Sequence, residues 1–302
     1  MSRQTLSFLM RRFREVGIEP KTRYGQNFLI DLNLLDILVD RAQLTPNDVV
    51  LEIGTGTGSL TALMAERAAQ IVTVEVDSQM HQLASEELID HANVELLQVD
   101  VLRNKNHLNA QVMETVARHL AAAPGRCFKL AANLPYNVAT PILSNLMTET
   151  MVPATMTVTI QKELADRIMA VPGTKDYSAL SVWLQSLCTV ELVRVLPPTV
   201  FWPRPKVHSA IIHLEFQPEW RAKIADLKFF HDCVRVLFFH RRKLLRHVLH
   251  IAFSNHLTKP GVDALLAELG FGPTARAEEI DVAGIQLLCE ALRQRSGGQL
   301  QL

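Results

Sequence analysis

The chain contains 302 residues, of which 48% are hydrophobic and 21% are charged. This balance is typical of a globular protein and argues against a disordered one, and the length predicts two domains or one large domain with an appendage. No apolar run approaches the ~18 residues that a membrane span needs, so no membrane partner is expected. The four cysteines are scattered and the eleven histidines lack ligand spacing, so buried free thiols and no metal site are expected.

The net charge is zero, but the charges are unevenly distributed along the chain. Residues 68–102 contain seven acidic residues and no Lys or Arg, whereas residues 235–250 contain five Lys or Arg residues and no acidic one. The first 24 residues carry six basic and two acidic residues. A basic arm and a basic helix beside an acidic pocket would suit a phosphate-rich polymer, although basic helix faces are often simply solvated.

The N-terminal segment, MSRQTLSFLMRRFREVG, is basic but has neither a long apolar core nor a small-residue cleavage site. We interpret it as mature sequence and expect a cytoplasmic protein. The alternative, an amphipathic organellar presequence, is weakened by Glu15 and Glu19.

Hydrophobic periodicity predicts alternating strands and helices over the first half of the chain. A helix at 31–42, with Asp31 as its N-cap, precedes a buried strand at 48–53 and the glycine-rich turn GTGTG. Strands at 71–76, 94–99, 127–132 and 156–160 follow, separated by helices at 59–69, up to about 90, 108–122 and 140–149. This alternation implies an α/β fold, with a parallel sheet and helices on both of its faces.

The second half changes character at about residue 216. Two strands near 187–195 and 207–215 flank a proline-rich elbow at 196–205, and helices are predicted at 226–239, 241–255, 261–269 and 281–295. We therefore predict a larger domain at 1–216 and a small all-α domain at 217–302.

Polar or glycine residues stand where four successive predicted strands end: Gly54, Glu75, Asp100 and Asn133. Ligands of parallel α/β sheets bind beyond the carboxyl ends of the strands. Four such positions in succession indicate one crevice more strongly than any one motif does.

The first three of these positions suit an adenosine-containing ligand. Glycines at 54, 56 and 58 allow a tight turn and close backbone approach, but Ser59 stands where a dinucleotide fingerprint needs a third spaced glycine. Glu75 can accept from both ribose hydroxyls and Asp100 from an adenine amino group, so S-adenosylmethionine fits better than NAD. Read alone, Glu75 could be a helix N-terminal charge and Asp100 a cap or turn residue.

The stretch AANLPYN at 131–137 ends the fourth strand in an amide, a proline and an aromatic ring. It could be an ordinary turn. It could also be a pocket for a flat amine: the Asn133 side chain and the Leu134 carbonyl would accept from the two amine hydrogens, with Pro135 fixing the backbone. Tyr136 would stack on the ring. Two such acceptors favour the pyramidal, more nucleophilic amine in the transition state.

Longer segments carry a resemblance to a known family. They are YGQNFLID at 24–31, LEIGTGTGSLT at 51–61, VTVEVD at 72–77, QVDVL at 98–102, ANLPYN at 132–137, QKELADRI at 161–168, KDYSALSV at 175–182, PPTVFWPRPKVHSAIIHL at 197–214 and HRRKLLRHVL at 240–249. With these segments the chain resembles the ribosomal RNA adenine dimethyltransferases, specifically the bacterial branch that dimethylates two adjacent adenosines near the 3′ end of small-subunit ribosomal RNA.

The resemblance implies a Rossmann-like class I methyltransferase sheet that binds S-adenosylmethionine within 1–216, and a helical RNA-docking domain at 217–302. It implies a monomer that acts on the small ribosomal subunit during ribosome biogenesis. The implied cofactor contacts are Asn27, Leu29, Gly54, Glu75, Asp100 and Asn133; the implied target site is Asn133, Leu134, Tyr136 and Phe201; and the implied RNA contacts are Arg241, Arg242 and Lys243. Phe201 would stack on the target base opposite Tyr136, unless it is a core aromatic at a strand start. The target base would have to turn out of its RNA context to enter the site.

The chain departs from the usual wording of the family at Thr55, Val101 and Trp202. None of these replaces a required polar group, although Trp202 could reshape the target pocket. Three rival functions are less favoured: methylation of large-subunit RNA as in the antibiotic-resistance branch, a non-catalytic role in RNA binding or transcription, and methylation of small molecules.

Overall fold

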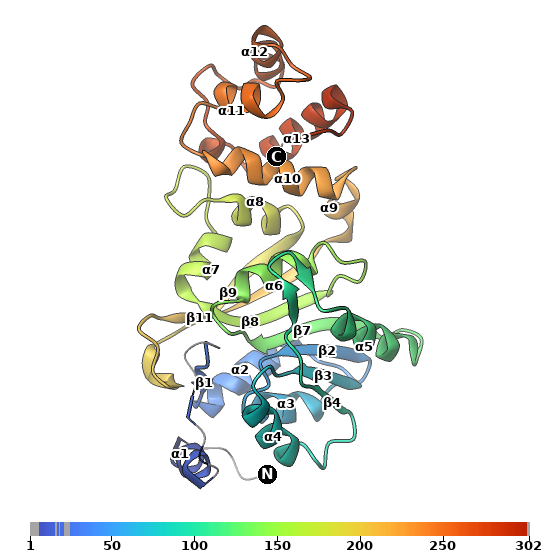
Figure 1. Cartoon of the computed structure of the whole chain (residues 1–302), viewed down its shortest axis with the longest axis vertical. Helices are drawn as coiled ribbons and strands as arrows, with labels where there is room; N and C mark the ends of the chain where they lie inside the picture. The colour runs from blue at the N-terminus through green and yellow to red at the C-terminus, as the bar shows by residue number, and fades with distance from the viewer. Residues whose placement is uncertain (1–5, 16, 18, 21–24, 301–302) are drawn as a thin grey trace. The chain divides into compact units, whose positions relative to one another are not determined.

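The computed structural model describes residues 6–15, 17, 19–20 and 25–300 (Figure 1). It divides into two compact units. The first contains residues up to Ala165 together with Glu191–Phe216, and the second contains Asp166–Val190 and Gln217–Leu302.

A seven-stranded sheet forms the centre of the first unit, with the strand order β4-β3-β2-β7-β8-β11-β9. The strands are β2 (Asp48–Ile53), β3 (Gln70–Val74), β4 (Val94–Leu97), β7 (Cys127–Asn133), β8 (Thr155–Gln161), β9 (Cys188–Leu196) and β11 (Ser209–Phe216). The first five of these pair in parallel, whereas β11 runs antiparallel to β8. The predicted parallel sheet is therefore confirmed for five strands, and the complete sheet is mixed.

Helices cover both faces of this sheet because the central strands are apolar on both sides. In β2, Val50 joins a core cluster with apolar residues of α2 and α3. Its neighbours Val49 and Leu51 point to the opposite face and are also fully buried. The helices of this unit are α1 (Leu6–Glu15), α2 (Leu32–Ala42), α3 (Ser59–Ala65), α4 (Ser78–Glu87), α5 (Ala110–Ala121), α6 (Ala139–Leu146) and the start of α7 (Lys162–Ile168).

The strand order reverses between β2 and β7. From β2 the chain proceeds to β3 and β4 on one side, and it then returns to β7 and β8 on the other side. The crevice outside the carboxyl ends of two such strands is where open α/β sheets bind ligands. Gly54 follows β2 and Asn133 ends β7, so two of the predicted site residues lie at this switch point.

Two small ribbons accompany the sheet. Strands β5 (Leu102–Asn104) and β6 (His107–Leu108) form a hairpin just before α5, where no strand was predicted. Strands β1 (Phe28–Leu29) and β10 (Phe201–Trp202) pair antiparallel, with Phe28 opposite Trp202. This second ribbon joins the segment before α2 to the proline-rich elbow, where a short 3₁₀ turn (Pro198–Val200) precedes β10.

Helix α1 was not among the predicted elements. It buries Leu9 and Phe13, and the Phe13 ring meets the edges of Phe28 and Trp202 at centroid distances of 5.5 and 5.1 Å. Of the basic residues predicted to form an N-terminal arm, Arg3, Lys21 and Arg23 lie outside the described residues.

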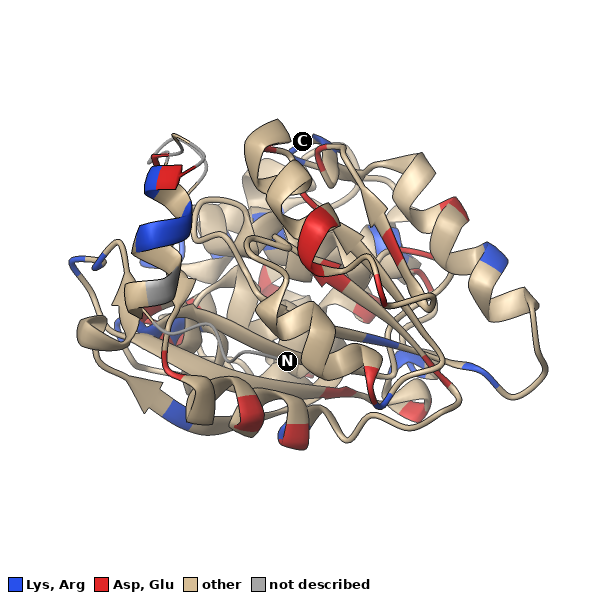
Figure 2. Ribbon diagram, turned by 90° about the horizontal axis from the view of Figure 1, so that it is seen from below, with Lys and Arg blue, Asp and Glu red and all other residues tan. Residues whose placement is uncertain are grey.

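The arginines on α1 form ion pairs with acidic side chains. Arg11 and Arg12 pair with Glu15, and Arg12 also pairs with Glu86. Figure 2 shows basic and acidic residues interspersed along the ribbon of the whole chain. The described part of α1 therefore gives no support to a purely basic arm.

The second unit is helical. It consists of the end of α7, α8 (Ala179–Gln185), α9 (Pro218–Ala222), α10 (Leu227–Phe239), α11 (Leu245–Ala252), α12 (Lys259–Glu268), a 3₁₀ turn (Ala277–Glu279) and α13 (Val282–Ser296). Its core is apolar and aromatic; the fully buried Trp183 of α8, for example, lies 6.2 Å from Phe230 of α10 between ring centroids.

The predicted boundary at 216 matches the start of the second segment of this unit, but the prediction did not assign Asp166–Val190 to the helical unit. The reason is packing. The buried Tyr177 donates a hydrogen bond to the carbonyl of Ile280, and α8 packs on α10 through Trp183. Such long-range contacts leave no mark in the local periodicity of the sequence.

Candidate active site

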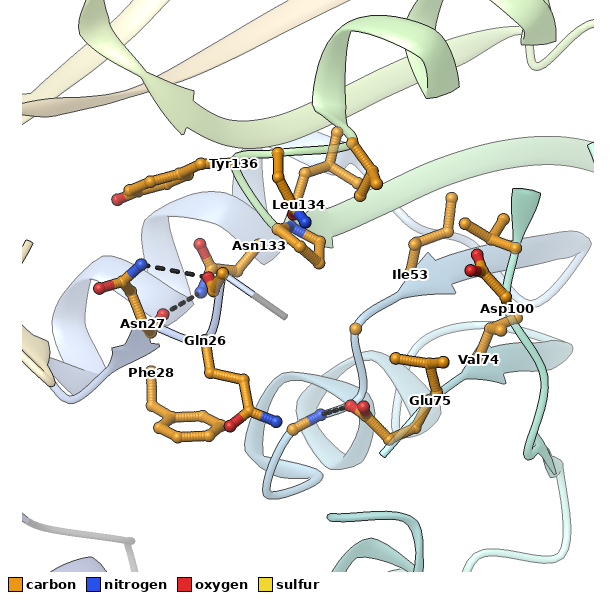
Figure 3. Close-up of a pocket in the computed structure, with 18 of the residues that line it drawn as sticks. Gln26, Asn27, Phe28, Ile53, Val74, Glu75, Asp100, Asn133, Leu134 and Tyr136 are labelled. Carbon is orange, nitrogen blue, oxygen red and sulfur yellow. Dashed lines mark hydrogen bonds between the residues drawn. The ribbon is translucent and has the colours of Figure 1, made fainter. Parts of the chain in front are cut away.

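A pocket opens at the carboxyl ends of β2, β3, β4 and β7 (Figure 3). Seven predicted site residues line it: Asn27, Gly54, Glu75, Asp100, Asn133, Leu134 and Tyr136. Figure 3 shows Glu75 and Asp100 on one side of the opening and Asn133, Leu134 and Tyr136 on the other. The structure thus brings together residues that are more than 100 positions apart in the sequence.

Gly54 makes the turn that follows β2 at the edge of the pocket. Its φ is +87°, a conformation that side-chain-bearing residues rarely adopt. A Cβ atom there would lie 3.3 Å from the ring of Pro135. Glycine is therefore required both by the backbone conformation and by the close approach of the NLPY segment.

Glu75 is held in place by backbone donors. Its Oε2 accepts from the N–H of Gly56 and its Oε1 from the N–H of Asp77, each at 3.0 Å. Each oxygen retains a further lone pair for a ligand hydroxyl. The side chain is only 6% exposed, and burial is the main reason that its pKa is raised above the usual value. A buried carboxylate that lines a pocket and has only backbone partners suits a ligand that donates hydrogen bonds.

A second acidic residue lies beneath the glycine turn. Glu52 of β2 is fully buried and accepts hydrogen bonds from the hydroxyls of Thr61 and Thr73, at 2.5 and 2.6 Å. Burial raises the pKa of Glu52 to about 8, so this group is largely protonated at neutral pH. Thr55, one of the departures from the family wording, bonds to Thr73 at 2.6 Å and extends this network into the turn.

Asp100 lies beyond the end of β4 and is exposed. Its Oδ1 accepts from the N–H of Leu102 at 2.9 Å, and its backbone carbonyl accepts from Asn109. This turn fixes the carboxylate and leaves Oδ2 as an acceptor toward the pocket wall that Asp100 helps to form. Asp100 is therefore a turn residue, as the alternative expected, and it also lines the pocket.

Asn133 is oriented by a contact from a distant segment. Its Nδ2 donates to the carbonyl of Asn27 at 2.9 Å, and Asn27 in turn donates to the carbonyl of Gly25 at 3.1 Å (Figure 3). Only the NH₂ end of the amide can bond to a carbonyl, so the other end, Oδ1, is fixed as an acceptor. The side chain therefore presents an oxygen acceptor at the end of β7.

The next residues continue this arrangement. The Leu134 N–H donates to the carbonyl of Thr159 in β8 at 3.1 Å, which holds the backbone at the pocket. The Tyr136 hydroxyl lies 2.5 Å from the hydroxyl of Ser209, a fully buried residue of β11. Burial raises the pKa of Tyr136, so the phenol stays neutral and its ring is anchored at the hydroxyl end.

Two predicted site residues lie elsewhere. Leu29 and Phe201 face each other in the β1–β10 ribbon, and both side chains are buried in the core cluster that also contains α2. Phe201 is only 2% exposed and does not line the pocket. In this structure Phe201 is a core aromatic at a strand start, which was the alternative to stacking on a target base.

Several residues of the pocket wall were not nominated from the sequence. Phe28 lines the pocket, and a Cβ on Gly56 would lie 3.1 Å from its ring, so Phe28 closes over the glycine turn. Gln26 also lines the pocket and bonds to Asp77 at 3.3 Å. Both belong to the GQNFL wording and could have been found there. Val76 directly follows Glu75 and adds an apolar side chain to the pocket wall. Nothing in the sequence distinguishes it from other valines at strand ends.

The predicted RNA-binding residues have different environments in the second unit. Arg241 donates to the backbone carbonyls of Tyr177 and Lys175 at 2.5 and 2.7 Å and pairs with Glu278 at 3.4 Å. Arg242 and Lys243 are exposed, and within the described part of the chain neither forms an ion pair. Arg241 therefore holds the turn in place, whereas the other two are available to a partner.

The fold and the site together define a Rossmann-like methyltransferase: a switch-point pocket with a glycine turn, a buried carboxylate and an amide acceptor at a strand end. Among the described residues, no cluster of His, Cys, Asp and Glu could hold a metal ion. Nor is any helix in these ranges long and apolar enough to cross a bilayer.

Comparison with known proteins narrows this class. The profile described as ribosomal RNA adenine dimethylase matches residues 18–268, and the chain belongs to this family. Proteins named ribosomal RNA small subunit methyltransferase A are similar to it. The one from Bacillus cytotoxicus is 38% identical over 281 residues, covering 91% of this chain and 92% of that protein. The one from Listeria monocytogenes is 38% identical over 272 residues, covering 89% of each.

Solved structures agree on the fold. A dimethyladenosine transferase from Plasmodium falciparum has a TM-score of 0.72 at 22% identity and covers 88% of this chain and 97% of its own. The 23S rRNA methyltransferase ErmE has a TM-score of 0.61 at 25% identity and covers 88% of this chain and all of its own. The predicted α/β methyltransferase fold and the family resemblance are thus confirmed, and the chain is a ribosomal RNA adenine dimethyltransferase.

Proposed function

We propose that this enzyme transfers methyl groups from S-adenosylmethionine to N6 of two adjacent adenosines near the 3′ end of small-subunit ribosomal RNA. The observation that carries the proposal is the Asn133 amide, whose NH₂ end is tied to Asn27 so that its oxygen is a fixed acceptor at the pocket. The relatives named for the small subunit support the choice of RNA.

The pocket residues fit S-adenosylmethionine. Glu75 is a buried carboxylate that is held by the backbone N–H groups of Gly56 and Asp77, and it can accept from ribose hydroxyls. Asp100 can accept from an adenine amino group. Gly54 lines the same pocket, and its lack of a side chain lets the ring of Pro135 lie close to the end of β2. When bound, this cofactor supplies a methyl group that its sulfonium centre already activates. Of the predicted cofactor contacts, Leu29 could take part only through its backbone, because its side chain is in the core.

At the target end, the chain orients and polarises an adenine amine. The Asn133 oxygen and the Leu134 carbonyl would accept its two hydrogens, which favours the pyramidal amine whose lone pair is available to attack. Tyr136, anchored to Ser209, would stack on the ring and hold it in place. No strong base is required, because positioning the amine supplies most of the rate enhancement. The buried Phe201 would have to move before it could meet a base.

We assign RNA docking to the helical residues 217–302, with Arg242 and Lys243 as phosphate contacts and Arg241 as the residue that holds their turn. We assign cofactor binding and catalysis to residues 1–216, except for Asp166–Val190, which belong to the helical unit. A monomer acting in the cytoplasm on the small ribosomal particle, as a step in ribosome biogenesis, is consistent with these assignments.

The test is methyl transfer from labelled S-adenosylmethionine to unmodified small-subunit ribosomal particles, with large-subunit RNA in parallel and the modified nucleoside identified by mass spectrometry. We expect N6,N6-dimethyladenosine at two adjacent positions of the small-subunit RNA. Label in large-subunit RNA alone would assign the enzyme to the resistance branch, and no label in either RNA would refute the proposal. Deleting residues 217–302 should abolish RNA methylation.

A further inference from the structure

The last residue of α10, Phe239, is the most exposed large hydrophobic side chain in the described part of the chain, at 82%. The helix does not need it for packing. Its inner face is formed by residues such as Phe230, Val234 and Phe238, all of which are buried. An aromatic ring in water contributes nothing to this fold, and burying it elsewhere would be favourable.

The turn that follows Phe239 is firmly held. The N–H of Lys243 donates to the carbonyl of His240 at 2.8 Å, and Arg241 bonds to the carbonyls of Lys175 and Tyr177. All of these partners belong to the helical unit. The turn therefore holds Phe239 in its exposed position before any partner arrives, which lowers the ordering cost of binding.

The chemistry around Phe239 is basic. His240 is exposed and its ring centroid lies 4.8 Å from that of Phe239. Arg242 and Lys243, three and four residues after Phe239, are exposed and form no ion pair among the described residues. A single exposed apolar side chain is common on protein surfaces, so the residues around Phe239 decide what it could bind. A held, exposed aromatic ring followed within four residues by two available cations complements a flat, apolar base attached to phosphates.

We propose that Phe239 stacks on an unpaired base of the ribosomal RNA while Arg242 and Lys243 contact the phosphates beside it. This inference rests on the proposed function, because it takes ribosomal RNA as the partner. It adds an aromatic contact outside the methylation pocket, which the basic residues alone did not indicate. Recognition of RNA by stacking is typical of single-stranded loops, bulges and ends.

Stacking and charge contacts respond differently to salt, and this difference separates them. Removing a stacked aromatic costs ~1–3 kcal/mol, which corresponds to about fivefold to a hundredfold in affinity. Phe239→Ala should therefore weaken RNA binding by this factor at every salt concentration. Lys243→Gln should instead flatten the plot of log affinity against log salt by about 0.7–0.9, because one phosphate contact is lost.

The experiment measures the affinity of the full-length protein for unmodified small-subunit particles and for protein-free small-subunit RNA at several salt concentrations. Phe239→Leu keeps an apolar side chain without a stacking face, and Phe239→Trp keeps the face. Ile89→Ala is the matched control, because Ile89 is 79% exposed but lies in the acidic part of the chain. We expect weakening with Ala and Leu, affinity close to the parent with Trp, and no change in the control.

Three results would overturn the proposal. Phe239→Ala that binds as tightly as Ile89→Ala would show that the ring makes no contact. A loss on the particle without a loss on protein-free RNA would assign Phe239 to a ribosomal protein. Full affinity of Phe239→Leu would show an apolar contact rather than stacking. Because these readouts are affinities, they are independent of whether the parent enzyme methylates small-subunit RNA, so this proposal and the proposed function can fail separately.

Discussion

Replacing Asn133 by alanine removes the acceptor proposed for the target amine. Loss of one preorganised transition-state contact of this kind costs ~2–4 kcal/mol, which predicts a fall in kcat of about thirtyfold to a thousandfold. The bond from Nδ2 to Asn27 at 2.9 Å is lost as well, which should cost about 1 kcal/mol of stability. Single-turnover methyl transfer to saturating small-subunit particles measures the first effect, and thermal unfolding measures the second.

Asn145→Ala provides the matched control. Asn145 is 8% exposed, and its amide also donates to a distant backbone carbonyl, that of Lys105 at 3.3 Å, but it does not line the pocket. It should lose comparable stability and retain turnover. If Asn133→Ala and Asn145→Ala turn over at the same rate, Asn133 acts only through folding, and its proposed contact with the target amine is refuted.

Three further predictions concern side chains around the pocket. Glu75→Gln should weaken the binding of S-adenosylhomocysteine, measured by calorimetry, by about tenfold or more. Because burial raises the pKa of Glu75, the affinity of the parent protein for this ligand should rise with pH, whereas that of the variant should not change. The same pH dependence in both proteins would show that Glu75 does not bind the ligand. Ser209→Ala should lower kcat/KM about fivefold without changing cofactor affinity, and combining it with Tyr136→Phe should add nothing further; additive losses would refute the anchor. Glu52 has a native pKa of about 8, above its unfolded value, so its stabilising effect is present at low pH and is lost as pH rises from about 4.5 through 8. The free energy of unfolding of Glu52→Gln, measured by denaturant titration, should fall with pH less steeply than that of the parent, by up to about 1.4 kcal/mol per pH unit; parallel curves would contradict a protonated Glu52.

The residues of the candidate site whose positions follow from the ends of strands could be predicted from the sequence. Strands whose periodicity is visible in the sequence end at or shortly before four of these residues, Gly54, Glu75, Asp100 and Asn133. Parallel strands bring their carboxyl ends to one edge of the sheet. The structure needed no unusual contact to assemble them. Their positions follow from the alternation of strands and helices.

Phe201 shows what the sequence could not provide. An aromatic residue at the start of a strand is equally compatible with a pocket wall and with a core. The choice depends on its antiparallel pairing with Leu29, about 170 positions earlier, which turns both side chains into the α2 core. A two-residue ribbon of this kind has no periodicity from which it could be predicted.

The structural contacts of Arg241 could not be read from the sequence for a related reason. Three consecutive basic residues in HRRK appear equivalent in the sequence, and a helix was predicted to include them. In the structure α11 begins at Leu245, and the turn before it directs Arg241 to the carbonyls of Lys175 and Tyr177 while its two neighbours face solvent. Which of three adjacent cations becomes structural depends on the packing of residues 166–190 in the helical unit, and that packing was not predicted.

The pocket is built from pairs of motifs that hold each other. The Gly56 N–H fixes Glu75, the Asn27 carbonyl orients Asn133, and Pro135 lies against Gly54. The cofactor end and the target end therefore share one set of backbone supports, and the segment around Asn27 belongs to both. A displacement of that segment should lower cofactor affinity and turnover together, whereas loss of the Asn133 oxygen alone should lower turnover and leave affinity intact. Measuring cofactor affinity and turnover together therefore distinguishes residues that hold the pocket in shape from a residue that contacts the reacting amine.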